Sequence, residues 1–367
     1  MTGPPDILAV AEQADDDERS APRPAPRIRV IWNPSSGSKG GISTSDADEE
    51  RVRTLMARAG LGDELVVCAA GDDVQAEAAD AVSLGYDLVV AAGGDGTVGL
   101  VAGELLGEQN VLGILPLGSV MNIARSLGIP RDPEAAADVI ASGEVAAIDV
   151  GEVSGQPFYE AGSVGMNAAL FREAGRFDEG DWSSIARTLW VAVRYRPARM
   201  SIDLEDRQIR TRALMVTVSN GPYTGAGMTV APGARLDDGK FDVRVFRRFS
   251  KIRLIRHLIS IAFGRYRYAP EVDTYRSRFV RIESRHPLPA RADSRDLGTT
   301  PVEFVTRPGA LRAVIPARVA GNDGPYPPLT SEVAGGGDVT GDAGYGRARP
   351  TSRMRATPGQ ARTERTG

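Results

Sequence analysis

The sequence predicts an α/β domain, a parallel sheet with helices on both faces, followed by a second domain of mostly antiparallel strands. In the first half, strands that are apolar on both faces alternate with helices, which indicates a parallel sheet covered on both sides. After Asp149, strand-like segments dominate and are separated by Gly, Pro and Asp turns, which favours antiparallel structure. The 367 residues are enough for two domains that each bury a core.

Periodicity divides each half into elements. Strands are expected at residues 28–32, 65–69, 87–92 and 111–115, and helices at 46–59, 74–84, 98–106 and around 119–127. In the second half, strands are expected at 157–164, 200–204, 211–219, 241–246, 279–282 and 302–306, and helices around 183–195 and 250–263.

The two ends of the chain lack any periodic apolar pattern. Residues 1–26 are rich in Ala, Pro, Asp and Arg, and residues 319–367 in Gly, Pro, Thr and Arg. Both are expected to be disordered, because they cannot bury enough surface to offset their ordering entropy. The α/β domain is therefore expected over 27–148 and the second domain over 149–303, with 304–318 returning to the first domain.

Composition excludes several classes of protein. A net charge of −4 argues against bulk nucleic-acid binding. The single cysteine, Cys68, excludes an intrachain disulfide and suits a reducing cytoplasm. Two histidines exclude a site with several histidine ligands. No window approaches the roughly 20 apolar residues that span a bilayer, and residues 15–18 are acidic where a signal peptide would be basic. A cytoplasmic protein is expected.

The motif Gly93-Gly94-Asp95-Gly96-Thr97 directly follows the third strand and precedes a helix. Glycines permit unusual backbone angles and leave room for a phosphate, and the helix N-terminus supplies N–H groups and a positive dipole end. Asp95 places a carboxylate where Mg²⁺ or its bound water would screen phosphates. Thr97 can cap the helix or donate its hydroxyl. The motif favours phosphate binding over an ordinary strand-to-helix turn.

Two further polar loops follow neighbouring strands. The first begins Asn33-Pro34-Ser35-Ser36-Gly37, and the second, Pro116-Leu117-Gly118-Ser119, follows the fourth strand. Each alone could equally be a solvated turn. Three glycine-bearing loops at three strand ends are better explained by one shared nucleotide site.

The chain resembles the bacterial diacylglycerol kinase-like lipid kinases, relatives of the eukaryotic diacylglycerol, sphingosine and ceramide kinases. The matching segments occur in the family's order from about residue 28 to 316. They are the three loops above with Ala124-Arg125, Asp149 with Gly151, Asn220-Gly221-Pro222, Ala231-Pro232-Gly233-Ala234 with Asp238-Gly239, and Pro308-Gly309-Ala310-Leu311.

The resemblance implies that the second domain is a β-sandwich and that the γ-phosphoryl group of ATP moves to a lipid hydroxyl, diacylglycerol- or sphingosine-like. It implies ATP contacts by the Asn33–Gly37 loop, by Gly93–Thr97 with Asp95 in catalysis, and by Ser119. It also implies a Mg²⁺ site where Asp238 gives its carboxylate and Arg235 and Lys240 their carbonyls. From the residues alone, an Asp-Gly hairpin turn explains this segment equally well.

Two positions depart from the family's pattern. Asn122 stands where the family has a carboxylate, and Arg295 stands where the family has its general base, a glutamate. Arginine cannot accept a proton, so the base is expected to be Asp293, Asp296 or Asp149, or the protein is a weak or non-catalytic member in which Arg295 binds phosphate. The other alternative is a kinase of the same superfamily that phosphorylates NAD.

A basic stretch offers a membrane contact. Residues 244–267 contain eight Lys or Arg and no acidic residue, and Ile252, Ile255, Ile259 and Phe263 share one helical face. Such a helix suits an anionic bilayer at the inner face of the membrane. Packing on the sandwich explains the apolar face somewhat better, and the cluster of arginines still favours anionic lipid headgroups nearby. The expected partners are ATP, a lipid acceptor and the membrane surface.

Overall fold

The computed structural model describes residues 25–35, 38–39, 42–43, 47–170, 194–225, 227–247 and 272–317. All of them belong to the first of two compact units, Met1–Pro328. The second unit, Leu329–Gly367, lies outside the described residues, as do the expected helix at 250–263, most of that at 183–195, and nearly all of the N-terminal tail.

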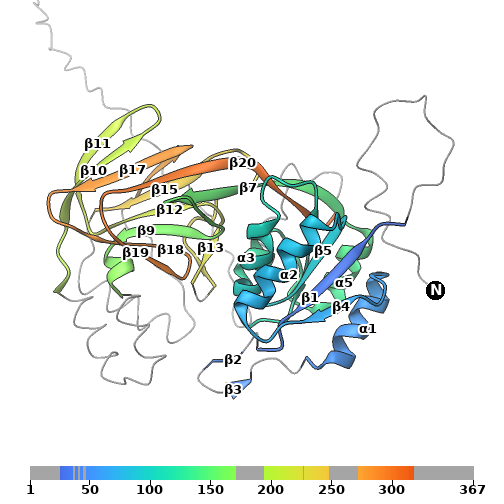
Figure 1. Ribbon diagram of the computed structural model, residues 1–367. Helices are drawn as coiled ribbons and strands as arrows, with labels where there is room; N and C mark the ends of the chain where they lie inside the picture. Colours follow the sequence, from blue (N-terminus) through green and yellow to red (C-terminus); the bar gives the residue numbers. More distant parts are fainter. Residues whose placement is uncertain are drawn as a thin grey trace, which may run out of the picture. The chain divides into compact units, whose positions relative to one another are not determined.

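The first domain contains the predicted parallel sheet (Figure 1). The strand order is β6, β5, β1, β4, and each neighbouring pair is parallel. The strands are β1 Ile28–Trp32, β4 Leu65–Val67, β5 Leu88–Gly93 and β6 Val111–Pro116. Every residue of β1, β5 and β6 is buried, as strands apolar on both faces require.

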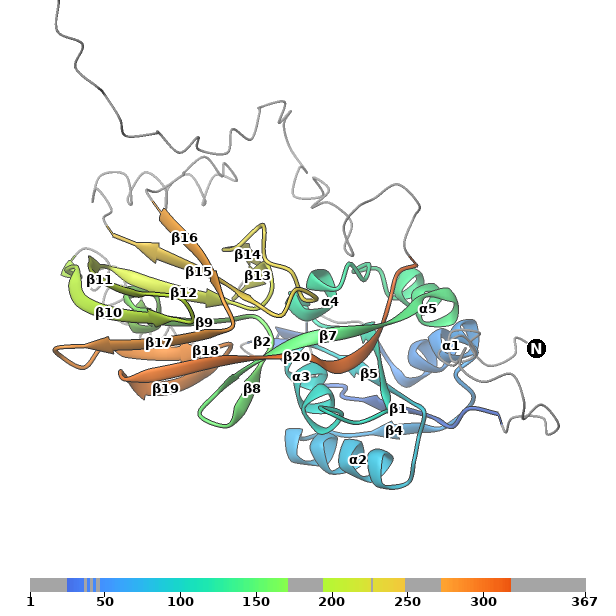
Figure 2. The same ribbon diagram turned by 90° about the horizontal axis from the view of Figure 1, so that it is seen from above.

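Helices cover both faces of this sheet (Figure 2). Helices α2 and α3 pack on one face, and α1 packs on the other with much of α5. The helices are α1 Glu49–Ala59, α2 Gly71–Ser83, α3 Asp95–Glu104, α4 Asn122–Ser126 and α5 Pro133–Ser142. Helix α5 was not predicted, although Asp132 caps it and proline occupies its first turn, a recognisable start signal.

The second domain is the expected antiparallel sandwich. One layer has the order β16, β15, β12, β9, β18, β19, and the other has β11, β10, β17, β20. The first layer comprises β16 Val272–Ser277, β15 Phe241–Phe246, β12 Met215–Ser219, β9 Ala161–Gly165, β18 Pro289–Ala292 and β19 Arg295–Thr299. The second comprises β11 Gln208–Ala213, β10 Ala198–Leu204 and β17 Phe279–Ser284, next to β20. Three fully buried rings, Phe158, Phe241 and Phe304, lie in the core between the layers.

Two long strands join the domains. Strand β20, Val302–Ile315, pairs with β17, with β6 and with β7, Glu144–Val153. The expected strand at 302–306 continues to Ile315, and its register with β7 shifts between Arg307 and Leu311. Since β7 and β20 run through positions 149 and 304, the domain boundaries stay a prediction.

Two expected strands are interrupted. The segment 157–164 forms β8, Gln156–Phe158, and β9, with Tyr159 and Glu160 between them. The segment 211–219 is divided at Leu214 between β11 and β12. Minor two-residue strands are β2 Ser38–Lys39, β3 Ile42–Ser43, β13 Tyr223–Thr224 and β14 Met228–Thr229.

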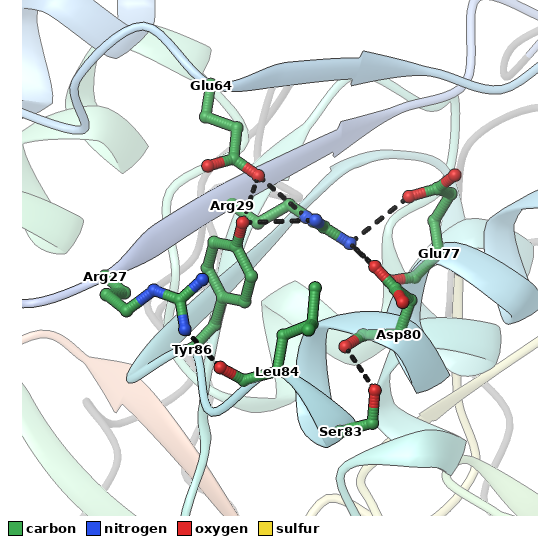
Figure 3. A network of polar contacts seen from close by, with 8 residues as sticks. All are labelled: Arg27, Arg29, Glu64, Glu77, Asp80, Ser83, Leu84 and Tyr86. Atoms are coloured by element: carbon green, nitrogen blue, oxygen red, sulfur yellow. Dashed lines mark hydrogen bonds and ion pairs between the residues drawn. The ribbon is translucent and has the colours of Figure 1, made fainter.

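A polar network holds the start of β1 (Figure 3). The Arg29 side chain is 9% exposed and pairs with Glu64 at 2.9 Å, Asp80 at 2.7 Å and Glu77 at 3.3 Å. Its guanidinium also donates to the Tyr86 hydroxyl and lies over that ring. A buried charge with several partners locks β1 against α2, at the opposite end of the strand from the loop that begins at Asn33.

Candidate functional site

The three predicted loops meet at one edge of the parallel sheet. The Asn33 backbone N–H donates to the Ala92 carbonyl at 3.1 Å, which places the first loop beside the end of β5. The third loop is closer still, because a Cβ on Gly118 would lie 2.5 Å from the Cα of Gly94. Only glycine permits this approach. The loops therefore form one continuous surface at the carboxyl ends of the strands, where parallel sheets bind phosphates.

The central loop passes directly from β5 into α3. Gly94 is the N-cap of α3, and no side-chain hydrogen bond caps the first turn of this helix. The helix begins at Asp95, three residues before the expected start, so Thr97 lies in the first turn and does not act as the N-cap. A Cβ on Gly96 would meet no atom within 4 Å. This open space beside a helix N-terminus suits an anion.

The Asp95 side chain connects helix α3, which follows the central loop, to helix α4, which follows the loop at 116–119. Its Oδ1 accepts the backbone N–H of Ile123, in α4, at 2.9 Å. The N-cap of α4 is Met121, a non-glycine residue with a φ of 57°. Such a conformation is uncommon outside glycine and is held here by its surroundings.

The outer loops are held by local contacts. Asn33 Oδ1 accepts the backbone N–H of Ser35 at 2.9 Å, and the Ser35 hydroxyl donates to the Ala69 carbonyl at 3.3 Å. Pro34 lies in the same turn, whereas Ser36 and Gly37 lie outside the described residues. The carbonyl of Ser119 accepts from Arg131.

The side-chain hydrogen bonds of Asp149 are made to segments other than these three loops. Its Oδ2 accepts the N–H of Gly239 at 2.6 Å, and its Oδ1 accepts the N–H of Gly309 at 2.8 Å. It is 4% exposed. Both oxygens are thus used to tie β7 to the turn at 235–240 and to the irregular part of β20, which favours a structural role over that of a base.

The expected metal turn has few open positions. Asp238 Oδ1 accepts from the Lys240 N–H at 3.0 Å, and its Oδ2 accepts from the Arg276 guanidinium at 3.1 Å. The Arg235 side chain pairs with Asp237. Among the described residues no group of three or more His, Cys, Asp or Glu side chains could hold a metal. Both oxygens of Asp238 thus accept from N–H donors, and the Mg²⁺ site formed by this carboxylate with the carbonyls of Arg235 and Lys240 stays a prediction.

Asp293 also has a structural position. Its carboxylate accepts the backbone N–H groups of Tyr159 at 2.8 Å, Glu160 at 2.9 Å and Ala161 at 3.2 Å. These three donors account for the interruption between β8 and β9. Burial raises the pKa of Asp293, whereas the three backbone hydrogen bonds lower it. Because the carboxylate already accepts these three bonds, its position is structural.

The remaining two candidates lie on the β18–β19 hairpin. Arg295 donates to the Pro157 carbonyl and to Gln156 Oε1, so its guanidinium is directed to strand β8. Asp296 is exposed and its side chain accepts from the Gly298 N–H within strand β19 at 2.8 Å. The structure therefore brings Asp95 together with the phosphate loops, and it does not bring Asp149 or Asp296 to them.

Glu160 is a candidate that the sequence interpretation missed. It is partly buried, and its Oε2 accepts the Gly225 N–H at 3.0 Å. Burial, and after it the charges of Asp293 and Asp95, raise the pKa of Glu160 to about 7, while hydrogen bonds from Asn122 and Gly225 oppose the rise. The overlooked signal was an acidic residue inside the apolar segment 157–164.

Comparisons with known proteins agree with this architecture. Residues 27–153 match the family model of the diacylglycerol kinase catalytic domain, and residues 162–315 match the YegS C-terminal NAD kinase beta sandwich-like domain. A diacylglycerol kinase from Bacillus subtilis (strain 168) is 26% identical over 300 residues, covering 80% of this chain and 98% of that protein. A Chromohalobacter salexigens protein named "Probable lipid kinase YegS-like" is 29% identical over 254 residues, covering 67% and 81%.

A solved structure has the same fold. The crystal structure of a diacylglycerol kinase from Bacillus anthracis str. Sterne superposes with a TM-score of 0.59 at 19% identity, covering 79% of this chain and 96% of that one. The two family models together span both described domains in the order that the motifs predict. The chain belongs to the bacterial diacylglycerol kinase-like family of lipid kinases.

Proposed function

We propose that this kinase binds ATP with Mg²⁺ on the loops at the ends of β1, β5 and β6 and transfers the γ-phosphoryl group to the hydroxyl of a diacylglycerol- or sphingosine-like lipid. The observation that supports it most directly is the loop at Gly93–Thr97. It combines a helix N-terminus without a side-chain cap and an empty space at Gly96. Phosphoryl transfer depends mainly on positioning and on neutralising charge, and this loop supplies both.

The residues act on the nucleotide from three sides. The first-turn N–H groups of α3 would bind the phosphates, and the loops that begin at Asn33 and end at Ser119 would enclose them. Asp95, held by Ile123, would face the water shell of a nucleotide-bound Mg²⁺. The metal would supply positive charge to the phosphates. The chain offers it one oriented carboxylate here, which fits an ion that keeps several waters and phosphate oxygens as ligands.

A membrane contact is part of the proposal, because the acceptor is a lipid. No helix among the described residues is long and apolar enough to cross a bilayer. The basic stretch at 244–267 would supply the contact, and all of it beyond Arg247 lies outside the described residues. The expected location is the cytoplasm with a peripheral contact at the inner membrane face.

A pair of glycine substitutions in one helix tests phosphate binding. Gly96→Ala places a methyl group in the open space of the first turn, and it should weaken ATP binding at least tenfold. Alanine favours a helix over glycine by roughly 0.5–1 kcal/mol, so the free energy of unfolding should not fall. Gly99→Ala is the matched control, since its Cβ would lie at an ordinary 3.6 Å from the Tyr159 ring. If calorimetry finds the same ATP affinity for both variants, the loop at Gly93–Thr97 is an ordinary strand-to-helix turn and does not bind phosphate.

The acceptor is tested with radiolabelled ATP and a lipid panel, with Asp95→Ala as the inactive control. Labelled diacylglycerol or sphingosine supports the proposal. If the protein binds ATP and labels no lipid, the lipid kinase proposal fails. Including NAD among the acceptors distinguishes the NAD kinase alternative, and an absence of every product would identify a non-catalytic nucleotide binder.

A further inference from the structure

Glu160 has a backbone that is fixed on both sides. Its N–H donates to Asp293 at 2.9 Å, and its carbonyl accepts the N–H groups of Asn220 at 2.9 Å and Gly221 at 3.1 Å. A residue between two strands would ordinarily be mobile, but here segments distant in the chain hold it from both sides. Such a position is preorganised, which is a property of catalytic groups.

The neighbouring ring brings this segment against α3. The hydroxyl of Tyr159 donates to the Gly99 carbonyl at 3.2 Å. A Cβ on Gly99 would lie 3.6 Å from the Tyr159 ring, and one on Gly103 would lie 3.7 Å from its hydroxyl. The two glycines are four residues apart and share one face of the helix. A Cβ at either position would make an ordinary van der Waals contact, so the β8–β9 segment lies directly beside this face of α3, whose N-terminus carries Asp95.

A chain of hydrogen bonds links Glu160 to the phosphate loop. Gly225 donates its N–H to Glu160 Oε2 at 3.0 Å and accepts from Asn122 Nδ2 at 2.8 Å through its carbonyl. Asn122 adjoins Ile123, whose N–H donates to Asp95 at 2.9 Å. The amide at 122 thus serves as a donor toward this group, and a carboxylate there would have repelled Glu160.

A narrow polar pocket adjoins the carboxylate. Gly225 and Asp293, which both contact Glu160, line it together with Ser163, Thr217 and Arg291. Ser163 pairs in register with both Thr217 and Arg291, so their side chains form a row across three strands. The Thr217 hydroxyl is buried and has no partner among the described residues. The pocket measures about 10 Å³, room for about one water, which would give this hydroxyl a partner.

We propose that Glu160 is the carboxylate that accepts the proton of the acceptor hydroxyl. The inference rests on the proposed lipid kinase function. In the step, the acceptor oxygen forms a bond to the γ-phosphorus, the bond from that phosphorus to the bridging oxygen of ADP breaks, and the acceptor proton passes to Glu160. The products are a phosphorylated lipid, ADP and a protonated carboxyl, which later releases its proton to water.

The electrostatic surroundings suit this role. Asp95 of α3 and Asp293 of the β18–β19 turn present negative charge to Glu160, and Arg291 of β18 presents positive charge. A pKa near 7 is close to the value at which a carboxylate is both deprotonated and basic enough to accept a proton. By contrast, the carboxylates of Asp149 and Asp293 are fully engaged by backbone donors.

Replacing the carboxylate with its isosteric amide tests the proposal. Glu160→Gln keeps an acceptor for the Gly225 N–H, so nucleotide affinity should stay within threefold of the wild type. The kcat for lipid phosphorylation should fall about 10²-fold. The wild-type rise of kcat/KM between pH 6 and pH 8 should disappear in the variant, a change that loss of a merely structural contact would not produce. Glu205→Gln, an exposed glutamate of the same domain, is the matched control.

The outcomes separate the two proposals. An active wild type together with a Glu160→Gln kcat within threefold would overturn the role of Glu160 and leave the lipid kinase function in place. A wild type that binds ATP and labels no lipid would overturn both. If Glu160→Gln does not fold, Glu160→Asp decides, because retracting the carboxylate by one methylene should lower kcat at least tenfold, and an unchanged kcat would contradict the proposal.

Discussion

The substitution Glu160→Gln should make the protein more stable at pH 8 than the wild type. Glu160 gains its proton more readily in the folded chain, where its pKa is about 7, than in an ordinary setting, where it is 4.5. A difference of about 2.5 between these pKa values, at about 1.4 kcal/mol for each pKa unit, corresponds to about 3.5 kcal/mol. This value is an upper limit for the nucleotide-free protein.

The sign follows from proton binding. Between pH 4.5 and about 7 the folded state holds more protons at this residue than the unfolded state does, so stability falls as the pH rises through that window. The contribution is fully present below pH 4.5 and is lost above about 7. The amide of the Glu160→Gln variant has no proton to lose, so the variant should gain stability relative to the wild type across the same window.

Urea unfolding at pH 5 and pH 8 measures the effect. The free energy of unfolding of Glu160→Gln relative to the wild type should increase by up to about 3 kcal/mol between these two pH values, and Glu205→Gln should show no such increase. A difference between variant and wild type that is the same at both pH values would refute the assignment of Glu160 as a carboxyl with a raised pKa. So would a variant that is less stable than the wild type at pH 8.

Three further predictions concern residues around the site. Asp149→Asn should lower the free energy of unfolding by about 2 kcal/mol in urea titrations, because its amide cannot accept from both Gly239 and Gly309. Arg295→Glu should not raise kcat, since it removes the donor to Pro157 and adds a charge near Asp293; a tenfold gain would show instead that the native site lacks a base. Arg29→Met should lower the melting temperature through a loss of about 3 kcal/mol, while calorimetry should find ATP affinity unchanged.

Local pattern predicted most of the first domain, with helix α5 as the exception. Its strands are apolar on both faces and alternate with helices, so the pattern indicated the parallel sheet, and the loop at Gly93–Thr97 could be assigned to the end of a strand. These signals are contained within about ten residues each, and burial of one face decides them. The strands of the sandwich were harder to predict from the sequence, because antiparallel pairing depends on partners far away in the chain. The strand at 157–164 illustrates this, since its interruption is caused by Asp293.

The base could not be read from spacing for the same reason. The contact between Asp293 and Tyr159 joins residues 134 positions apart, and the family pattern directed attention to Arg295 and its neighbouring aspartates. Only the folded chain shows that Asp293 accepts backbone N–H groups, that Asp296 is exposed, and that hydrogen bonds through Gly225 and Asn122 link Glu160 to the helix that contacts Asp95. Residue types and local periodicity determined which loops can bind a phosphate. Long-range packing decided which carboxylate is left beside it, because burial and neighbouring charge are properties of the tertiary structure.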